Sequence, residues 1–184
     1  MILLKECKVE TEKLASITAT ILTIDPHDLS KTKWNKYLFL IDSVYFNSPN
    51  GDLKKTLTGL EFIKMPYGPV VKEFNQYISL LKSKHGFQLK SYIGYSSGNM
   101  TFIELDQNSK YDTDKLSLFE KQVIAKTVNT FKNYNASELS DLTHEMDAWK
   151  NEELFNSIDF SKTNLDQYIF QKTKKNNLYQ LLFS

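Results

Sequence analysis

The chain has 184 residues, and its 23 cationic side chains, all lysines, against 22 acidic residues leave a formal net charge of +1. Its 41% hydrophobic content, with 12 Phe, 10 Tyr and 2 Trp, suits one domain that closes its core without disulfides or metals, and it excludes an intrinsically disordered chain. Because arginine makes the commonest specific base contact and the net charge is near zero, the composition argues against nucleic acid as the main partner.

The first part of the chain predicts two helices. Apolar residues recur at helical spacing over residues 9–24, and Pro26 ends this first helix. Ser30 is a suitable cap for the second helix, whose apolar face is so broad that the helix belongs in the core. The turn-forming residues 47–51 end it.

A short strand and a third helix follow. Residues 57–65 are rich in strand formers and predict an extended segment. Pro69 suits the first position of a helix that ends near Gly86.

Tyr67-Gly68-Pro69 predicts a stiff turn, because glycine permits a positive φ and the prolines at 66 and 69 fix theirs. The structural interpretation is a rigid joint with Tyr67 packed against the core. The functional interpretation is a turn that presents Tyr67 to a partner.

The second half of the chain predicts a hairpin and more helices. Residues 87–95 and 100–106 form two β-prone runs around a four-residue loop. Asp114 is the expected cap of a long helix that stops around Asn135, and Ser137 begins a short helix. The segment from residue 158 onward predicts a helix near 165–172 and closes with an apolar end at 178–183. These elements indicate an α+β fold, a mostly helical single domain with a small antiparallel sheet or hairpins on one side.

His144 and Trp149 form a second distinctive cluster. If the helix breaks at Thr143, and Thr143 caps the turn that follows, the two rings come close to one another and to the Tyr67 turn. One interpretation is a buried histidine satisfied by backbone and packed under tryptophan. The other is a polar centre in a groove, formed by His144 with Asp147 or Glu145.

Other chemistry lacks its motifs. The histidines at 27, 85 and 144 are far apart in sequence and have no metal-binding spacing, so we expect no metal site. Cys7 excludes an internal disulfide, and a Cys7-based nucleophile is disfavoured. No glycine-rich phosphate loop occurs, so we expect no cofactor. No stretch approaches the ~18 uncharged apolar residues of a membrane span, and no signal peptide opens the chain, which predicts a soluble cytoplasmic protein.

Four short motifs occur in order along the chain. They are Lys36-Tyr37-Leu38-Phe39-Leu40-Ile41-Asp42, Thr58-Gly59, Met65-Pro66-Tyr67-Gly68-Pro69-Val70-Val71, and residues 136–144 followed by Ala148-Trp149. In these motifs the chain resembles the Panacea domain family, which includes SocA-like proteins and many phage-associated proteins. The resemblance covers about residues 31–170, which leaves residues 1–30 as an N-terminal helical extension and 171–184 as a C-terminal tail.

The resemblance implies an antitoxin of a toxin–antitoxin system, in a prophage or phage-defence setting, that neutralises a cognate protein toxin encoded nearby by binding it directly. It also implies an alternative, a proteolytic adaptor that delivers the toxin to a protease. A third and weaker alternative is an enzyme with a His144/Asp147 acid–base pair; otherwise we expect no enzyme. The family-signature positions, which are candidates for partner binding, are Tyr67, Gly68, Pro69, Thr143, His144 and Trp149.

Overall fold

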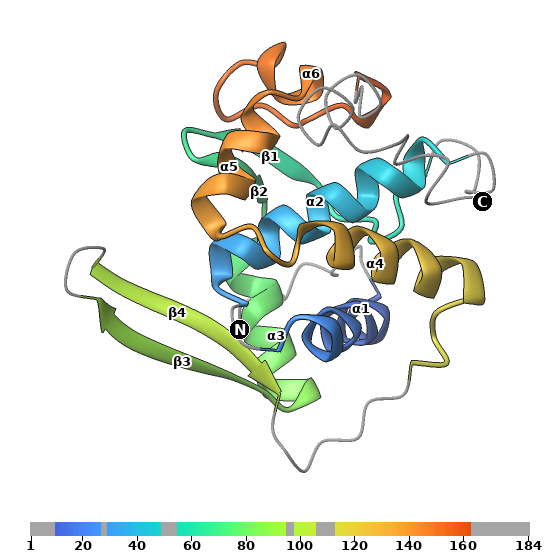
Figure 1. Ribbon diagram of the computed structural model, residues 1–184, viewed down its shortest axis with the longest axis vertical. Helices are drawn as coiled ribbons and strands as arrows, with labels where there is room; N and C mark the ends of the chain where they lie inside the picture. Colours follow the sequence, from blue (N-terminus) through green and yellow to red (C-terminus); the bar gives the residue numbers. More distant parts are fainter. Residues whose placement is uncertain (1–9, 27–28, 49–54, 95–97, 106–112, 163–184) are drawn as a thin grey trace, which may run out of the picture.

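The computed structural model describes residues 10–26, 29–48, 55–94, 98–105 and 113–162. Within these residues the elements, in chain order, are α1 (Thr11–Ile24), α2 (Lys31–Phe46), β1 (Phe62–Met65), β2 (Gly68–Val71), α3 (Phe74–His85), β3 (Phe87–Gly94), β4 (Gly98–Leu105), α4 (Leu118–Phe131), α5 (Ala136–His144), α6 (Asp147–Lys150) and the 3-10 helix η1 (Phe160–Lys162). The strands form two separate antiparallel hairpins, β1–β2 and β3–β4, beside the helices (Figure 1). The mostly helical α+β fold is therefore confirmed.

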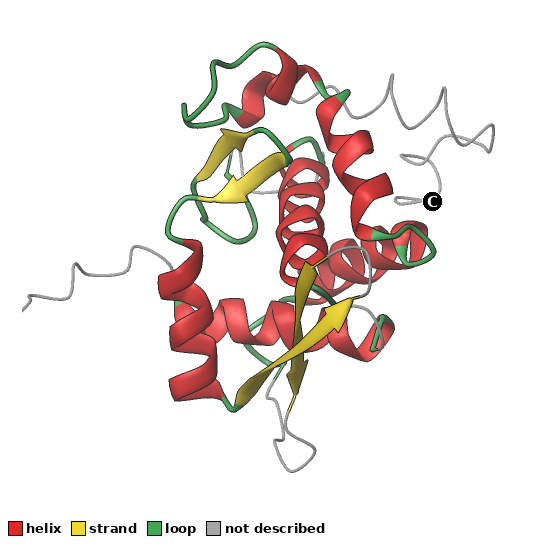
Figure 2. Ribbon diagram, turned by 90° about the vertical axis from the view of Figure 1, so that its left-hand side faces the viewer, coloured by secondary structure: helices red, strands yellow, loops and turns green. Residues whose placement is uncertain are grey.

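Helix α2 is the centre of the core (Figures 1 and 2). Every residue from 33 to 45 is buried, and the helix packs against α4, α5, β2, β4 and η1. The Ser30 hydroxyl accepts a hydrogen bond from the Lys33 backbone N–H, as expected of a cap. A helix that is enclosed on all sides also buries its polar side chains, and each of these then needs a partner inside the protein.

Helix α1 shares this core and packs against α3 and α4. It ends, as predicted, just before Pro26. The buried Lys33 ammonium lies 2.8 Å from the Asp25 carboxylate and donates to the Lys132 carbonyl at 3.2 Å. The Tyr37 hydroxyl donates to the same Asp25 carboxylate at 2.7 Å. These contacts fix the end of α1 to α2 and pair the charge of a buried lysine.

The prediction that Pro69 begins a helix is wrong. Pro69 lies in strand β2, and α3 begins at Phe74. Met65 pairs with Gly68, so residues 66–67 form the turn of a tight hairpin. A strand forms here in place of a helix because the backbone of β2 bonds to β1. The fixed φ of proline is compatible with a strand as well as with a first helical turn.

The remaining strand predictions are confirmed with changed bounds. Of the predicted segment 57–65, only the part from Phe62 onward pairs as a strand. The predicted runs 87–95 and 100–106 form the β3–β4 hairpin. Strand β4 begins at Gly98, so two residues of the expected loop belong to the strand.

The starts of the later helices differ from the prediction. Ser117, not Asp114, caps α4, because its hydroxyl accepts from the Glu120 N–H while the Glu120 carboxylate accepts from the Ser117 N–H. Asn135 caps α5 by the same reciprocal arrangement, one residue before the helix and two before Ser137. Both sites have a glutamate three residues after the cap, and this spacing is the sequence signal that identifies the observed caps.

Several predictions fall outside the described residues. They concern Cys7, His27, the helix near 165–172 and the apolar end at 178–183. Among the helices that the structure does describe, none has the length and apolar character needed to cross a bilayer.

Candidate functional site

The signature residues come together where the β1–β2 turn meets α2, α5 and α6 (Figure 1). Gly68 is at the centre of this cluster and has φ +95°. A Cβ atom at this position would lie 2.6 Å from Lys36 Nζ and 2.9 Å from Thr143 Oγ1. The backbone of the turn thus rests directly on two buried side chains, and both its conformation and this close approach require glycine.

Lys36 lies under the turn and is only 1% exposed. Its Nζ donates to the Pro69 carbonyl at 3.0 Å, and burial lowers the pKa of this amine to about 7. The neighbouring Asn35 side chain accepts from the Val71 N–H at 2.9 Å. Two consecutive residues of α2 therefore hold strand β2 by hydrogen bonds.

The Thr143 side chain is buried against Gly68, and its hydroxyl donates back to the Ser140 carbonyl at 2.9 Å. The expectation that Thr143 caps a following turn is wrong, because α5 continues through His144 and the break comes at residues 145–146. A threonine hydroxyl can bond to the preceding helical turn without ending the helix, which is what happens here.

The expected proximity of His144 and Trp149 is confirmed despite this shifted break. Their rings are stacked, with centroids 4.2 Å apart and an angle of 29° between the planes. The Lys64 ammonium lies 4.2 Å from the centre of the Trp149 ring and donates to the Glu152 carbonyl at 2.8 Å and the Lys150 carbonyl at 3.3 Å. Lys64 thereby joins the end of α6 to strand β1, with a cation–π contact as well as two hydrogen bonds.

The electrostatics of the cluster favour neutral His144. Burial and the nearby positive charge of Lys36 lower the pKa of His144, while Asp141 and Glu145 oppose that shift. Within the described residues, His144 Nε2 and Trp149 Nε1 are buried without a hydrogen-bond partner. The packing of the histidine against tryptophan is thus observed, but Nε2 lacks the partner that this interpretation expected. The carboxylates acting on the charge of His144 are those of Asp141 and Glu145.

Tyr67 differs from the other signature residues because its side chain is 80% exposed. The expectation that it packs against the core is wrong. Since Met65 pairs with Gly68, residue 67 is in the turn of the hairpin, where its side chain is exposed to solvent. The rigid turn therefore presents an aromatic side chain to solvent.

A second buried contact holds the chain before β1. The fully buried Asp42 carboxylate accepts hydrogen bonds from the Thr58 backbone N–H at 2.8 Å and from the Thr58 hydroxyl. Burial raises the pKa of Asp42 to about 7. Asp42, Thr58 and Lys36 stand in the motifs that carry the family resemblance, but neither they nor Lys64 were among the candidate site residues. An ionisable residue inside an apolar helical run is the signal that could have identified Lys36 and Asp42.

None of the described residues form a group of three or more histidine, cysteine or acidic side chains placed to hold a metal ion. The described cluster is composed instead of hydrogen bonds between neighbouring elements, one stacked ring pair and one cation over a ring. Such contacts fix the position of one element against another.

Comparison with protein families matches residues 35–150 to the family described as antitoxin SocA-like, Panacea domain. The chain belongs to this family. No curated protein and no solved structure matches it significantly. The Panacea match contains both hairpins and all six signature residues, so the cluster around Gly68 lies entirely within the family domain.

The Gly68→Ala variant tests the close approach at the centre of the Panacea domain. We expect it to lower the free energy of unfolding by about 1–3 kcal/mol, because a side chain at φ +95° is strained and its Cβ meets Lys36 and Thr143. Gly59→Ala is the matched control, since Gly59 also has positive φ (+68°) but is exposed. Urea denaturation in which Gly68→Ala costs no more than Gly59→Ala would contradict this assignment.

The lowered pKa of Lys36 predicts that the free energy of unfolding depends on pH. Its pKa is about 7 in the folded protein and 10.5 when unfolded, so between these values the unfolded chain binds more protons and folding stability rises with pH. Lys36→Met removes this contribution. The free energy of unfolding of the wild type minus that of the variant should therefore increase from pH 7 to pH 9, by up to about 1.4 kcal/mol per pH unit. Parallel stability curves in denaturant titrations at pH 7, 8 and 9 would refute the prediction.

Proposed function

We propose that this protein is the antitoxin of a toxin–antitoxin pair and that it neutralises a cognate protein toxin, encoded by an adjacent gene, by binding it directly. The observation that carries the proposal is the match to the SocA-like Panacea family over residues 35–150, the part of the chain that contains the whole signature cluster. The setting we propose is the cytoplasm of a cell that carries the pair in a prophage or phage-defence locus.

Direct neutralisation makes physical demands that this molecule meets. A stoichiometric antitoxin needs nanomolar affinity, about −12 kcal/mol, and hence a standard-sized interface with a few well-buried aromatic or apolar anchors. The described surface exposes large apolar side chains of this kind. They include Tyr67, Tyr92, Ile93, Met100, Leu154 and Phe155. A rigid scaffold beneath such side chains lowers the entropic cost of binding.

We propose that the signature cluster supports binding rather than catalysis. Lys36 donates to the Pro69 carbonyl and Thr143 to the Ser140 carbonyl, so both side chains are occupied by the fold itself. Lys64 likewise bonds to the carbonyls at the end of α6. The function that we infer is binding to another protein, without turnover of a substrate.

Co-expression with the adjacent gene tests the proposal. We expect the adjacent protein to arrest growth when expressed alone, this protein to restore growth, and the two to co-purify in a defined ratio. The level of the adjacent protein should be the same with and without this protein. A fall in that level which depends on a host protease would instead support the adaptor alternative. Absence of both rescue and co-purification would contradict direct neutralisation.

His144→Ala separates binding from acid–base chemistry. If His144 only packs against Trp149, a variant that melts cooperatively should still restore growth, because the His144–Trp149 contact is internal. The matched variant Asp147→Asn removes the other member of the proposed pair. Loss of protection in both variants, with folding intact by circular dichroism, would favour an enzyme.

A further inference from the structure

The β3–β4 hairpin extends away from the helices (Figure 1). Its base is part of the core, where Phe87 and Ile103 are 2% and 1% exposed. Toward the far end the strands lose this support, and Ile93 is 86% exposed. An isolated two-stranded ribbon gains little stability of its own in water, so apolar side chains at its far end are not explained by the fold.

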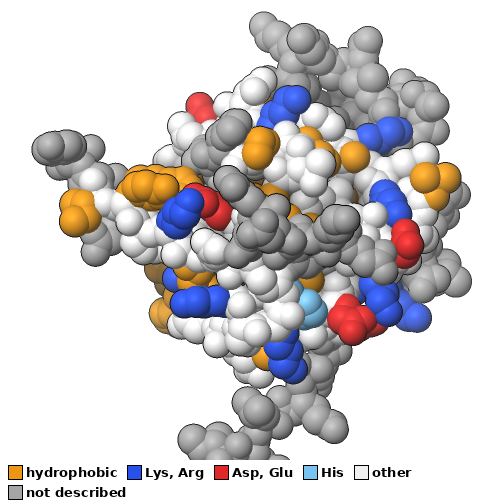
Figure 3. Space-filling view, turned by 90° about the horizontal axis from the view of Figure 1, so that it is seen from below, with side chains coloured by type: hydrophobic (Ala, Val, Ile, Leu, Met, Phe, Trp, Pro, Cys, Tyr) orange, Lys and Arg blue, Asp and Glu red, His pale blue; other side chains and the backbone are white. Residues whose placement is uncertain are grey.

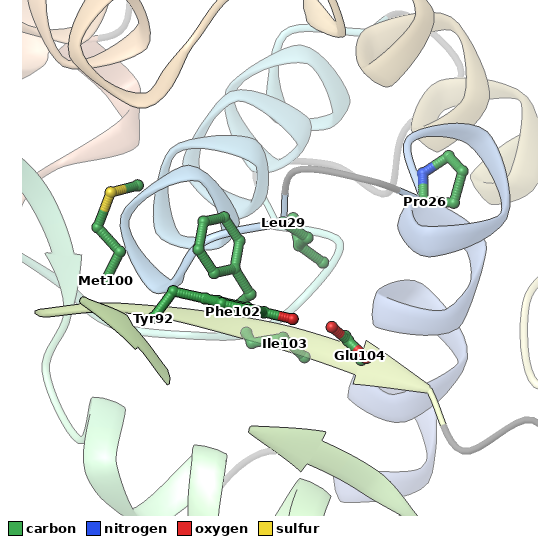
Figure 4. A pocket seen from close by; sticks show the side chains of 7 residues that line it. All are labelled: Pro26, Leu29, Tyr92, Met100, Phe102, Ile103 and Glu104. Atoms are coloured by element: carbon green, nitrogen blue, oxygen red, sulfur yellow. The ribbon is translucent and has the colours of Figure 1, made fainter. Parts of the chain in front are cut away.

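Apolar side chains occupy both faces of the far end. The register pairs Tyr92 with Met100, which places both on the face that carries Phe102 (Figure 4). Because successive side chains of a strand alternate between faces, Ile93 belongs to the opposite face. The Tyr92 and Phe102 rings contact edge to face with centroids 5.6 Å apart. A flat surface could cover only one face of this ribbon. A cleft with two walls could cover both.

A pocket lies beside the same face. Its volume is about 340 Å³, and it is formed by Met100 and Phe102 of β4 together with Pro26 and Leu29 from the connection after α1 (Figure 4). Glu104 is the charged residue among those that line it, and its carboxylate is paired with Lys90 Nζ at 2.5 Å. The pocket is therefore apolar, with its one acidic side chain neutralised by an ion pair.

The sequence of the hairpin contains no charged residue between Lys90 and Glu104. Residues 91–103 contain no lysine or acidic residue, in a chain that is 24% charged overall. Depletion of charge together with tyrosine, phenylalanine and methionine is typical of the buried centre of protein interfaces. The space-filling view shows apolar side chains gathered on the projecting hairpin (Figure 3).

The surface around Tyr67 has a different character. Near that turn, the segment after α5 exposes Leu154 and Phe155, but it also carries the ion pairs Lys150–Glu145 at 3.0 Å and Lys162–Glu152 at 2.7 Å. Exposed ion pairs resemble the polar rim of an interface and contribute little affinity. Of the two surfaces, the hairpin is the one whose lack of charge matches an uncharged apolar partner.

We propose that the far end of the β3–β4 hairpin, formed by Tyr92, Ile93 and Met100, is the toxin-binding surface. We propose that it enters an uncharged, apolar cleft of the toxin that has two walls. Tyr92 and Met100 contact one wall and Ile93 the other, while the pocket beside Phe102 receives an apolar side chain of the toxin. This inference rests on the proposed antitoxin function and adds to it the location and chemistry of the contact.

The test compares two substitutions by aspartate, one at an isoleucine and one at a leucine, which are side chains of the same size. Ile93→Asp places a charge in the proposed contact, and Leu118→Asp, at a side chain that is 74% exposed in the first turn of α4, is the matched control. The probe is the adjacent gene product, captured on equal amounts of each tagged full-length variant, with growth rescue as the second readout. We expect Ile93→Asp to retain less than one-tenth of the wild-type amount and to lose rescue, and Leu118→Asp to stay within twofold of wild type.

The outcomes separate the two proposals. If wild type neither captures the adjacent protein nor restores growth, the antitoxin function fails and the inference fails with it. If wild type binds and Ile93→Asp binds equally well, the hairpin assignment alone is overturned. Should Ile93→Asp melt at a lower temperature than wild type, Ile93→Ser replaces it, with an expected loss of at least threefold. A wild-type dimer that Ile93→Asp converts to monomer, with toxin capture unchanged, would assign the surface to self-association instead.

Discussion

The contact of the Gly68 backbone with Lys36 and Thr143 is the constraint on which the rest of the site depends. It brings the β1–β2 hairpin onto both the central helix α2 and helix α5, at a distance that leaves no room for a side chain. The lysine amine is buried to make this contact, and its one described hydrogen bond, to the Pro69 carbonyl, explains why a polar group can stay inside the core. Lys64 and Trp149 extend the same connection to α6.

Internal support and the surface that we propose for recognition are separate in this molecule. The signature residues, apart from Tyr67, hold elements together by internal contacts and leave few groups available to a partner. The β3–β4 hairpin has the opposite character, because its base is fixed in the core and its far end is exposed, apolar and uncharged. A family domain with this division can keep its internal contacts constant while the exposed side chains suit a particular toxin.

The sequence predicted the elements whose signals are local. Helical periodicity, the Ser30 cap and the β-prone runs of the second hairpin identified α1, α2 and β3–β4. It did not predict that Pro69 is in a strand, since proline is compatible with both structures and only pairing with β1 decides. Nor did it indicate that Lys36 is buried, because its partner is a backbone carbonyl 33 residues away in the sequence. The sequence also left the exposure of Tyr67 open between a packed and a presented side chain, because that exposure depends on how β1 pairs with β2.

Hydrogen–deuterium exchange of the protein, alone and bound to the adjacent gene product, tests the central claim most directly. Amide exchange reports which backbone segments become protected by a partner. If internal support and partner contact are separate, binding should slow exchange in β3 and β4 and leave residues 62–71 and 136–149 unchanged. Protection confined to residues 62–71 and 136–149, with the hairpin exchanging as in the free protein, would contradict the account.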